Sequence, residues 1–579
     1  MPEAGTGWGV TGISVILGDR MVLNDVSLET IPGSVVAVVG GDGAGKTTLL
    51  RAMCGRVIPA TGTVTVPHRR RIGYQPATAG SWANLTVEQN LAVVARAYGL
   101  DRGRLHQRQE DLLTAAGLLE ARHRLASQLS GGMRQKLGFC MAILHEPEML
   151  VLDEPSTGVD PVSRVELWAL ISDAVARGAA VVMATTYLDE AERTQQVLAL
   201  DRGVALLQGT PAEVLADAPG TVTRVAVATR PSLAWRRGRQ VRQWHPGPPQ
   251  PGDAVVTPDM EDAFVAAALD HRGDGGSPVP VPPPVTVADC DVLIAATDVS
   301  QHFGGTLAVD HVSMRVAPGE IVGLIGANGA GKTTLIRILL GLLEPSQGEV
   351  DLFGAPPSRQ TRRKVGYVPQ GLGLYRDLTV AENLAFVAAA YGESARPEGE
   401  LAELSGDLVD AIGLGQRRQL AFACALAHAP ALLVLDEPTS GVDPIARARL
   451  WDTIHTQAEA GAGLLVSTHY MQEAEQCDRL ILMDLGRVVA EGTTAQIIES
   501  TTATQVRTAT WTGAFEALRA ADLPVALAGR EVRVVDTSPD TVREVLGAAG
   551  VSCQVDVVPA TLEEKMTAIT RARAGVATL

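Results

Sequence analysis

The chain carries two glycine-rich motifs of nearly the same sequence, far apart from each other. VVGGDGAGKTTLLRAMCG begins at Val38, and LIGANGAGKTTLIRILLG begins at Leu324. A second pair, VLDEPSTGVDP from Val151 and VLDEPTSGVDP from Val434, is separated by almost the same interval. Because two separate motifs recur at this shared interval, we infer that one domain was duplicated, with small insertions and deletions between the copies. The fold must therefore contain two domains of one kind.

The remaining segments predict a linker and a smaller domain. GDGGSPVPVPPPV separates the two copies, and its Gly and Pro content predicts a semi-extended linker that does not pack. After the second copy, strand-like and helix-like runs alternate as QVRTATW, GAFEALRAA, REVRVVD, DTVREVLGAAG and SCQVDVVP, which predicts a small βαββαβ domain. The predicted organisation is a first domain (1–220), its accessory tail (221–271), the linker (272–290), a second domain (291–499) and a C-terminal α+β domain (500–579).

Each glycine-rich motif has the form GxxxxGK[ST] and lies between a β-branched apolar run and a helical apolar run. This is the context of a phosphate-binding loop, in which backbone N–H groups and the helix dipole meet phosphate oxygens. The lysine of such a loop reaches the β- and γ-phosphates of a nucleotide. The candidate nucleotide-binding residues are Gly40, Gly43, Gly45, Lys46, Thr47 and Thr48 in the first copy, and Gly326, Asn328, Gly329, Gly331, Lys332, Thr333 and Thr334 in the second.

An apolar run ending in Asp-Glu follows each phosphate loop. The aspartate is predicted to hold Mg²⁺ together with the first threonine of the loop, and the glutamate to polarise the attacking water. An Asp-Glu pair after a strand can also be a helix cap, but here the pair recurs at a matched distance from Gly40 and from Gly326. The predicted residues are Thr47, Asp153 and Glu154 in the first copy, and Thr333, Asp436 and Glu437 in the second.

A further motif, LSGGM from Leu129, precedes the Asp153 strand. Together with the two phosphate loops, the DEP strands and the TGVD and SGVD loops, it resembles the signature of ABC ATPases, and the resemblance covers both halves of the chain. It implies two P-loop NTPase domains of α/β fold that bind ATP and Mg²⁺ and hydrolyse ATP. In this family two such domains dock head to tail, so Ser130, Gly131 and Gly132 would cap the nucleotide held by the other copy.

The resemblance also makes the two copies unequal. YVPQGLGLYRDLTV places Gln370 shortly before Leu378, where the family has a glutamine that senses Mg²⁺ and water. The first copy reads YQPATAGSWANLTV and has Ala77 at that place, with Gln75 too early in the motif. The glutamine of the first copy is therefore missing or displaced.

The residue that contacts the γ-phosphate differs as well. The second copy reads STHYMQEAE, with His469 at the position of the family's switch histidine, whereas the first reads ATTYLDEAE, with Thr186 there. A threonine lacks the reach and the charge of imidazole. Phe303, upstream of the second phosphate loop, is a candidate for stacking on adenine and equally for the core, and Leu17 takes its place in the first copy.

The signature shows the opposite difference, because the second copy lacks it. An ungapped comparison leaves Ile412-Gly413-Leu414-Gly415-Gln416, without the serine. LSGD from Leu404 lies farther from Asp436 than LSGGM lies from Asp153. Whether Leu404-Ser405-Gly406 replaces the signature stays open at this point.

Head-to-tail docking would collect all of these defects in one site. Site one would combine Lys46, Ala77 and Thr186 with the second copy's missing signature. Site two would combine Lys332, Gln370, Asp436, Glu437 and His469 with the first copy's Ser130 turn, and it is complete. The sequence thus predicts one catalytic site and one degenerate site that binds ATP; Glu154 is retained, so slow turnover in site one stays open.

The composition restricts the partners. A formal charge of −16 argues against nucleic acid, which requires a basic footprint. Six cysteines without a CxxC pair predict neither zinc nor disulfides. No signal peptide is expected at the start, and LAFACALAHAPALLVL (420–435), which contains His428 and Pro430, predicts a helix followed by a buried strand and not a membrane span.

An ABC ATPase without membrane spans implies separate integral-membrane permease subunits and a place on the cytoplasmic face of the plasma membrane. LTVEQNL, LTVAENL and the C-terminal domain resemble ATPases of multidrug and antibiotic exporters, with the surface near Trp82 and Tyr375 as the candidate permease contact. Ribosome-acting ATPases of this family would carry a charged helical linker and a basic surface. Sugar importers also fuse two ATPase domains and remain an alternative.

Overall fold

The computed structural model supplies the fold of most of the chain. It describes residues 7–159, 161–249, 252–273, 290–440, 442, 444–468, 470–499, 501–508, 510–528, 531–566 and 568–569. Most of the predicted linker (272–290) lies outside these residues. The chain forms two units, here called unit 1 (1–220, 257–272 and 502–559) and unit 2 (221–256, 273–501 and 560–579).

Unit 1 is built on a six-stranded sheet with the order β5-β6-β7-β3-β8-β9, parallel except for the pair β8 and β9. The run VVAVVG forms β3 and is buried along its whole length, as expected for a strand that is covered on both faces. In sheet order the strands are Ile72–Gln75, Met149–Asp153, Ala180–Thr185, Val35–Gly40, Gln196–Asp201 and Val204–Gly209.

Helix α1 and a three-stranded antiparallel sheet cover one face of this six-stranded sheet and share a hydrophobic core with it. The antiparallel sheet has the order β2-β1-β4, with strands Arg20–Thr30, Trp8–Leu17 and Thr61–Thr65. Helix α1 (Lys46–Met53) follows β3 directly after the phosphate loop. The arrangement places that loop at the carboxyl end of a buried strand, where α/β proteins bind their ligands.

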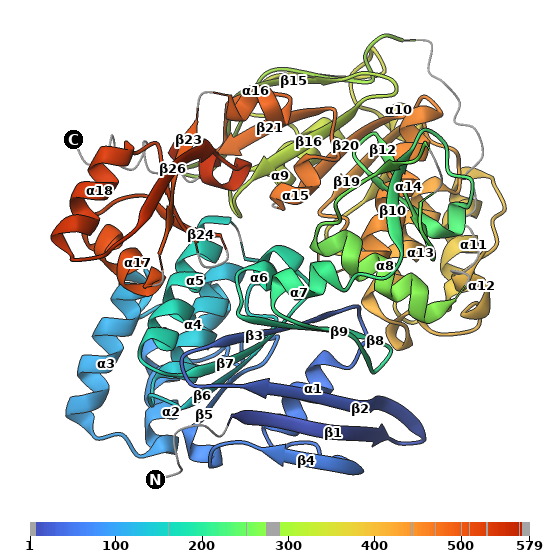
Figure 1. Cartoon of the computed structure of the whole chain (residues 1–579). Helices are drawn as coiled ribbons and strands as arrows, with labels where there is room; N and C mark the ends of the chain where they lie inside the picture. Colours follow the sequence, from blue (N-terminus) through green and yellow to red (C-terminus); the bar gives the residue numbers. More distant parts are fainter. Residues whose placement is uncertain are drawn as a thin grey trace. The chain divides into compact units, whose positions relative to one another are not determined.

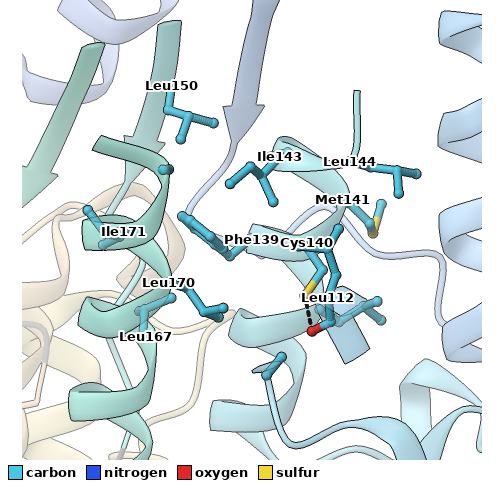
Figure 2. Close-up of a cluster of buried hydrophobic side chains, with 14 of the residues drawn as sticks. Leu112, Phe139, Cys140, Met141, Ile143, Leu144, Leu150, Leu167, Leu170 and Ile171 are labelled. Atoms are coloured by element: carbon cyan, nitrogen blue, oxygen red, sulfur yellow. Dashed lines mark hydrogen bonds between the residues drawn. The ribbon is translucent and has the colours of Figure 1, made fainter. Parts of the chain in front are cut away.

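A second core on the opposite face anchors helix α4, which carries the signature motif, together with its neighbouring helices. Figure 2 shows Phe139 of α4 pointing toward Leu170 and Ile171, while Cys140 lies beside Leu112, whose carbonyl accepts its Sγ–H hydrogen bond. Side chains that surround α4 on several sides fix the position of this helix. The helices of unit 1 are α2 (Val87–Tyr98), α3 (Arg102–Ala115), α4 (Gly131–Ile143), α5 (Pro161–Ala176), α6 (Leu188–Glu192), α7 (Pro211–Ala216) and α8 (Met260–Arg272).

Unit 2 repeats this plan with the sheet order β18-β19-β20-β16-β21-β22 and the antiparallel sheet β15-β14-β17. The first sheet contains Val365–Val368, Leu432–Asp436, Gly463–Thr468, Ile321–Gly326, Arg479–Asp484 and Arg487–Gly492, and the second Thr306–Val316, Ile294–Phe303 and Gln347–Leu352. The helices are α9 (Lys332–Leu339), α10 (Arg359–Arg362), α11 (Val380–Tyr391), α12 (Glu400–Glu403), α13 (Leu414–Leu426), α14 (Pro444–Glu459), α15 (Met471–Ala474) and α16 (Thr494–Ile498). The stretch 420–435 forms the end of α13 and most of β19, so the prediction of a helix followed by a buried strand is confirmed.

The C-terminal segment forms the predicted βαββαβ order and packs within unit 1 (Figure 1). Its antiparallel sheet has the order β24-β25-β23-β26, and its core includes Ala169 of α5. Arg519 also lies 3.6 Å from Asp173 of α5. The elements are β23 (Thr502–Arg507), α17 (Trp511–Ala520), β24 (Val525–Ala528), β25 (Glu531–Val535), α18 (Pro539–Ala548) and β26 (Gln554–Pro559).

The tail of the first copy differs from the expected accessory of domain 1, because the structure divides it between the units. Strands β10 (Thr221–Val225), β11 (Ala234–Arg237), β12 (Gln240–His245) and β13 (Ala254–Val255) form a sheet in unit 2, whereas α8 belongs to unit 1. Arg236 of β11 donates hydrogen bonds to Asp452 and Glu459 of α14. These ion pairs join the sheet to the second copy. They could not be predicted from local sequence pattern, because their partners lie more than 200 residues apart.

No helix in the described part of the chain is long and apolar enough to cross a membrane.

Candidate active sites

The two phosphate loops have the same internal geometry. Lys46 Nζ donates to the carbonyls of Gly40 at 2.7 Å and Gly41 at 3.1 Å, and Lys332 Nζ to the matching carbonyls of the second loop at the same distances. Both lysines are buried. These bonds close each loop around the ammonium group, which is the arrangement needed to present backbone N–H groups to a phosphate.

Glycine is required at the end of each loop for two reasons. Gly45 has φ 103° and Gly331 has φ 99°, in the left-handed region that side chains disfavour. A Cβ on Gly45 would also lie 2.5 Å from Leu23 Cδ2, and one on Gly331 would lie 2.3 Å from the Ala308 carbonyl oxygen. Any larger residue would displace the start of the following helix.

A threonine hydroxyl and an aspartate meet beside each loop. Thr47 Oγ1 donates to Asp153 Oδ1 at 3.1 Å, and Thr333 Oγ1 donates to Asp436 Oδ2 at 3.0 Å. Burial raises the pKa of both aspartates, while the threonine hydrogen bonds act in the opposite direction. Paired hydroxyl and carboxylate oxygens are ligands that suit Mg²⁺ when phosphates and water complete the shell, so the residues fit this ion.

The glutamates that follow these aspartates have the same backbone conformation, and a glutamine side chain meets one of them. Glu154 has φ 48° and Glu437 has φ 52°, an uncommon conformation that occurs at functional sites. Glu154 lies 3.5 Å from Lys46 and accepts a hydrogen bond from Thr157 Oγ1 at 3.1 Å. Glu437 accepts one from Gln370 Nε2 at 3.0 Å, so the structure brings this predicted pair together.

The first copy uses its nearest glutamine elsewhere. Gln75 is fully buried in β5, and its Nε2 donates to Gln135 Oε1 of α4 at 2.7 Å. Gln135 in turn donates to the Ala77 carbonyl at 3.1 Å. Gln75 therefore connects β5 to the signature helix, while Ala77 offers no side-chain group toward Glu154.

The switch positions follow strands β7 and β20. Thr186 is 1% exposed after β7, and His469 lies outside the described residues. One helical turn after each position comes a buried glutamate that the sequence did not single out. Glu190 accepts hydrogen bonds from Ser156 and Thr185, and Glu473 accepts one from Thr439. Both glutamates have a raised pKa because of burial, and that of Glu473 is about 7. The repeated EAE sequence was the available signal.

Helices α4 and α13 begin at equivalent residues, which settles how the signature motifs align. Ser130 caps α4 by accepting from Met133 N at 3.3 Å, and Gly413 occupies the cap position of α13 without a side chain. LSGD lies instead in a turn beside α11, where the Ser405 and Asp407 carbonyls accept from Ala381 N and Val380 N at 3.1 and 3.0 Å. The ungapped comparison thus gives the structural counterpart of the signature.

Arg418 is a buried residue that sequence reasoning missed. It takes the place of Gln135 on α13 and donates to the backbone carbonyls of Glu437 and Pro438, each at 2.8 Å, and to that of Ser440. A guanidinium group with several donors suits such a cluster of carbonyls. Once the motifs are aligned, the replacement of Gln135 in RQK by Arg418 in RRQ is the one sequence feature that could have indicated it.

The remaining candidates are exposed. Phe303, at the end of β14, is 51% exposed, which leaves its ring accessible to a base and removes the core alternative. Trp82 and Tyr375 are 47% and 49% exposed in the turns before α2 and α11.

Two phosphate loops, each beside an Asp-Glu strand end, and a helix opening on a Ser-Gly-Gly turn together define an ATPase of the ABC type. Residues 23–157 and 309–440 match the ABC transporter family. The probable multidrug ABC transporter ATP-binding protein YbhF of Escherichia coli (strain K12) is 35% identical over 511 residues, covering 80% of this chain and 88% of that protein. The chain therefore belongs to the family of ABC transporter ATP-binding proteins.

Two further comparisons cover different parts of the chain. Nod factor export ATP-binding protein I of Burkholderia lata is 42% identical over 217 residues, which cover 35% of this chain and 71% of that protein. The solved structure of archaeal ribosome recycling factor aABCE1 with ribosomal stalk protein aP1 gives a TM-score of 0.60 at 17% identity, covering 93% of this chain and 98% of that chain. The second likeness shows the tandem fold alone.

Proposed function

We propose that this ATPase powers export of a drug or another small hydrophobic compound through separate integral-membrane permease subunits at the cytoplasmic face of the plasma membrane. The observation that carries the proposal is the similarity to a multidrug ABC transporter ATP-binding protein along both copies. The export protein of Burkholderia lata, which resembles part of the chain, supports the same direction of transport.

We further propose that the two nucleotide sites differ in activity. Site two joins Lys332, Thr333, Asp436 and the Gln370–Glu437 pair to the Ser130 turn of the first copy, and His469 would complete it. Site one joins Lys46, Thr47 and Asp153 to the Gly413 turn and contains Ala77 and Thr186. Site one would bind ATP, whereas site two would hydrolyse it.

The contacts of the described residues support these roles. Glu437, held by Gln370 at 3.0 Å, would orient the attacking water and accept its proton. Glu154 contacts Lys46 and Thr157, and the first copy has Ala77 where the second has Gln370, so no side-chain amide from that position orients Glu154. Mg²⁺, held by Thr47 and Asp153 or by Thr333 and Asp436, would supply positive charge next to the phosphates.

The proposal is tested by isolating the tagged full chain from detergent-solubilised membranes of its source and identifying the proteins that accompany it. Integral-membrane proteins with several spanning helices should co-purify in stoichiometric amount, and the ATPase activity should be retained in that complex. Recovery with ribosomal subunits, or with an extracytoplasmic solute-binding protein and its membrane partner, would contradict the export proposal and favour one of the two alternative classes.

A further inference from the structure

Each copy presents one surface that is built in the same way, from the turn before a helix, that helix, and a returning loop. In copy 1, Asn90 Oδ1 accepts from Trp82 N at 2.7 Å and the Arg124 carbonyl accepts from Val87 N at 3.1 Å. In copy 2, Asn383 Oδ1 accepts from Tyr375 N at 2.9 Å and the Asp407 carbonyl accepts from Val380 N at 3.0 Å. We call residues 82–98 with 122–128 surface A, and residues 375–391 with 405–411 surface B.

Both surfaces expose large apolar side chains at matched positions. Surface B exposes Tyr375, Phe386 and Leu408, of which the last two are 53% and 48% exposed. The Tyr375 and Phe386 rings meet edge to face with their centroids 5.1 Å apart, so they form one continuous aromatic patch. Surface A has Trp82 and Val93 at the corresponding places. Exposed apolar side chains that gather in one patch are a common feature of protein interaction sites.

The charges around the two patches have opposite sign. Surface A carries three arginines and one glutamate, a net charge of +2, and surface B carries one arginine and four carboxylates, a net charge of −3. The clearest exchange is at one matched position, where Arg124 of surface A corresponds to Asp407 of surface B. The charged residues are Glu88, Arg96, Arg122 and Arg124 on surface A, and Arg376, Asp377, Glu382, Asp407 and Asp410 on surface B.

The carboxylates of surface B are available to a partner. Asp377, Glu382, Asp407 and Asp410 are exposed, and Arg376 Nε approaches Asp410 only to 3.9 Å. Hydrogen bonds from Thr379 lower the pKa of Glu382, so it stays charged. On surface A, Glu88 lies 3.2 Å from Arg122, which neutralises one arginine and leaves Arg124 exposed.

We propose that surfaces A and B receive two unlike protein segments: surface B a segment with apolar side chains flanked by lysine or arginine, and surface A one flanked by aspartate or glutamate. The inference rests on the proposed function, since the segments would be cytoplasmic parts of the membrane subunits. Complementary charge steers such encounters and disfavours the wrong pairing, because like charges repel across an interface. The membrane partner therefore presents two different docking segments, on two different subunits or on one asymmetric chain.

A photocrosslinking experiment on the full chain tests this inference. Benzoylphenylalanine would replace Phe386 in one protein and Val93 in another, each would be irradiated with membranes of the source, and the captured peptides would be identified by mass spectrometry. Both positions should capture loops of membrane proteins, with a net basic peptide at position 386 and a different, net acidic peptide at position 93. Capture of one and the same segment at both positions would overturn the inference and leave the proposed function intact. Capture of no membrane protein at either position would contradict the proposed function and with it this inference.

Charge variants in the same proteins supply a second measurement. Asp407→Arg combined with Glu382→Gln should lower the crosslinking yield at position 386 about tenfold and leave the yield at position 93 unchanged, because rim charges control association. Arg124→Asp should lower the crosslinking yield at position 93 and leave the yield at position 386 unchanged. Glu398→Arg, an exposed position of the same subdomain outside surface B, is the matched control and should leave both yields unchanged. Equal loss at both positions in any of these variants would contradict separate docking.

Discussion

At the scale of single residues, the two glutamates that directly follow strands β6 and β19 share their backbone conformation, and they differ in whether a glutamine meets them. Both have positive φ and both follow a buried aspartate that holds a threonine. Only Glu437 is met by a glutamine, Gln370, which lies in the loop after β18. In the first copy, that loop offers Ala77, and Gln75 is used inside the fold. The proposed catalytic difference between the copies would therefore lie in the side chains around a shared backbone conformation.

We predict that Glu437→Gln lowers the ATPase rate at least about a hundredfold, since it removes the base that would accept a proton from water. The matched variant Glu154→Gln should retain the rate within about threefold, because its site would contribute little turnover. The measurement is steady-state phosphate release by the full chain, with nucleotide binding followed in parallel to show that both variants still bind ATP. Equal losses in the two variants would contradict one catalytic and one degenerate site.

We predict that the free energy of unfolding depends on pH because of the buried carboxyl group of Glu473. Burial raises its pKa from 4.5 to about 7, so the folded protein holds a proton that the unfolded chain releases at lower pH. The resulting stabilisation is complete below pH 4.5 and is lost as pH rises through about 7, on the order of 3 kcal/mol in total. Glu473→Gln should therefore melt at a higher temperature than the natural protein at pH 8, and the difference should shrink toward pH 5. Thermal unfolding over this range measures it, with the exposed Glu475→Gln as a control that should follow the natural protein; a difference independent of pH would contradict the prediction.

At the scale of elements, helices α4 and α13 show what keeps a helix in place after its motif has changed. Leu420, Phe422 and Ala425 of α13 are buried at the positions of Leu137, Phe139 and Ala142 of α4. Their packing holds the register, so that α13 begins at Leu414 although glycine has replaced the capping serine. Losing a serine cap costs a helix only about 1 kcal/mol or less, which a buried core of this size exceeds.

Local sequence pattern predicted some features of these elements and missed others. The strand–loop–helix order around Lys46 and Lys332 was readable, because local composition fixes it. The connections of α4 and α13 to their cores were not: Gln135 reaches Gln75, whereas Arg418 reaches the carbonyls after β19. These bonds join residues 60 and 19 positions apart, and no local rule selects such partners.

At the scale of the whole molecule, the chain exchanges segments between its two units. Residues 221–256 continue from the first copy but belong to unit 2, and residues 502–559 continue from the second copy but belong to unit 1. The first exchange is held by Arg236 with Asp452 and Glu459, and by Arg239 Nη2, 2.7 Å from Asp478. The second is held by the apolar core shared with α5. The chain therefore passes between unit 1 and unit 2 at several points, and the linker is only one of them.

We predict that cutting the chain within 274–289 does not separate its halves. A protease site introduced there would give two fragments, and they should elute together on gel filtration at the size of the intact chain. The N-terminal fragment supplies residues 221–256 to unit 2, and the C-terminal fragment supplies residues 502–559 to unit 1. Denaturant should be needed to part them. The charge reversal Arg236→Asp should weaken the association, whereas Arg224→Asp, at an exposed position of the same sheet, should not. Separation of the fragments upon cleavage alone would contradict the exchange.

The sequence by itself determined the duplicated domain, the phosphate loops with their Asp-Glu partners, the βαββαβ order and the loss of glutamine and signature from opposite copies. Each of these is encoded over a few neighbouring residues, where backbone conformation and apolar periodicity leave a local record. Only the tertiary structure decided that Gln75 donates a hydrogen bond to Gln135 and that Gly413, not Ser405, caps the helix that corresponds to α4. It also decided that the tail sheet belongs to unit 2 and the C-terminal domain to unit 1. Those outcomes depend on side-chain packing and charge pairing between segments as many as 223 residues apart, as between Arg236 and Glu459, and such contacts leave no periodic trace in either segment alone.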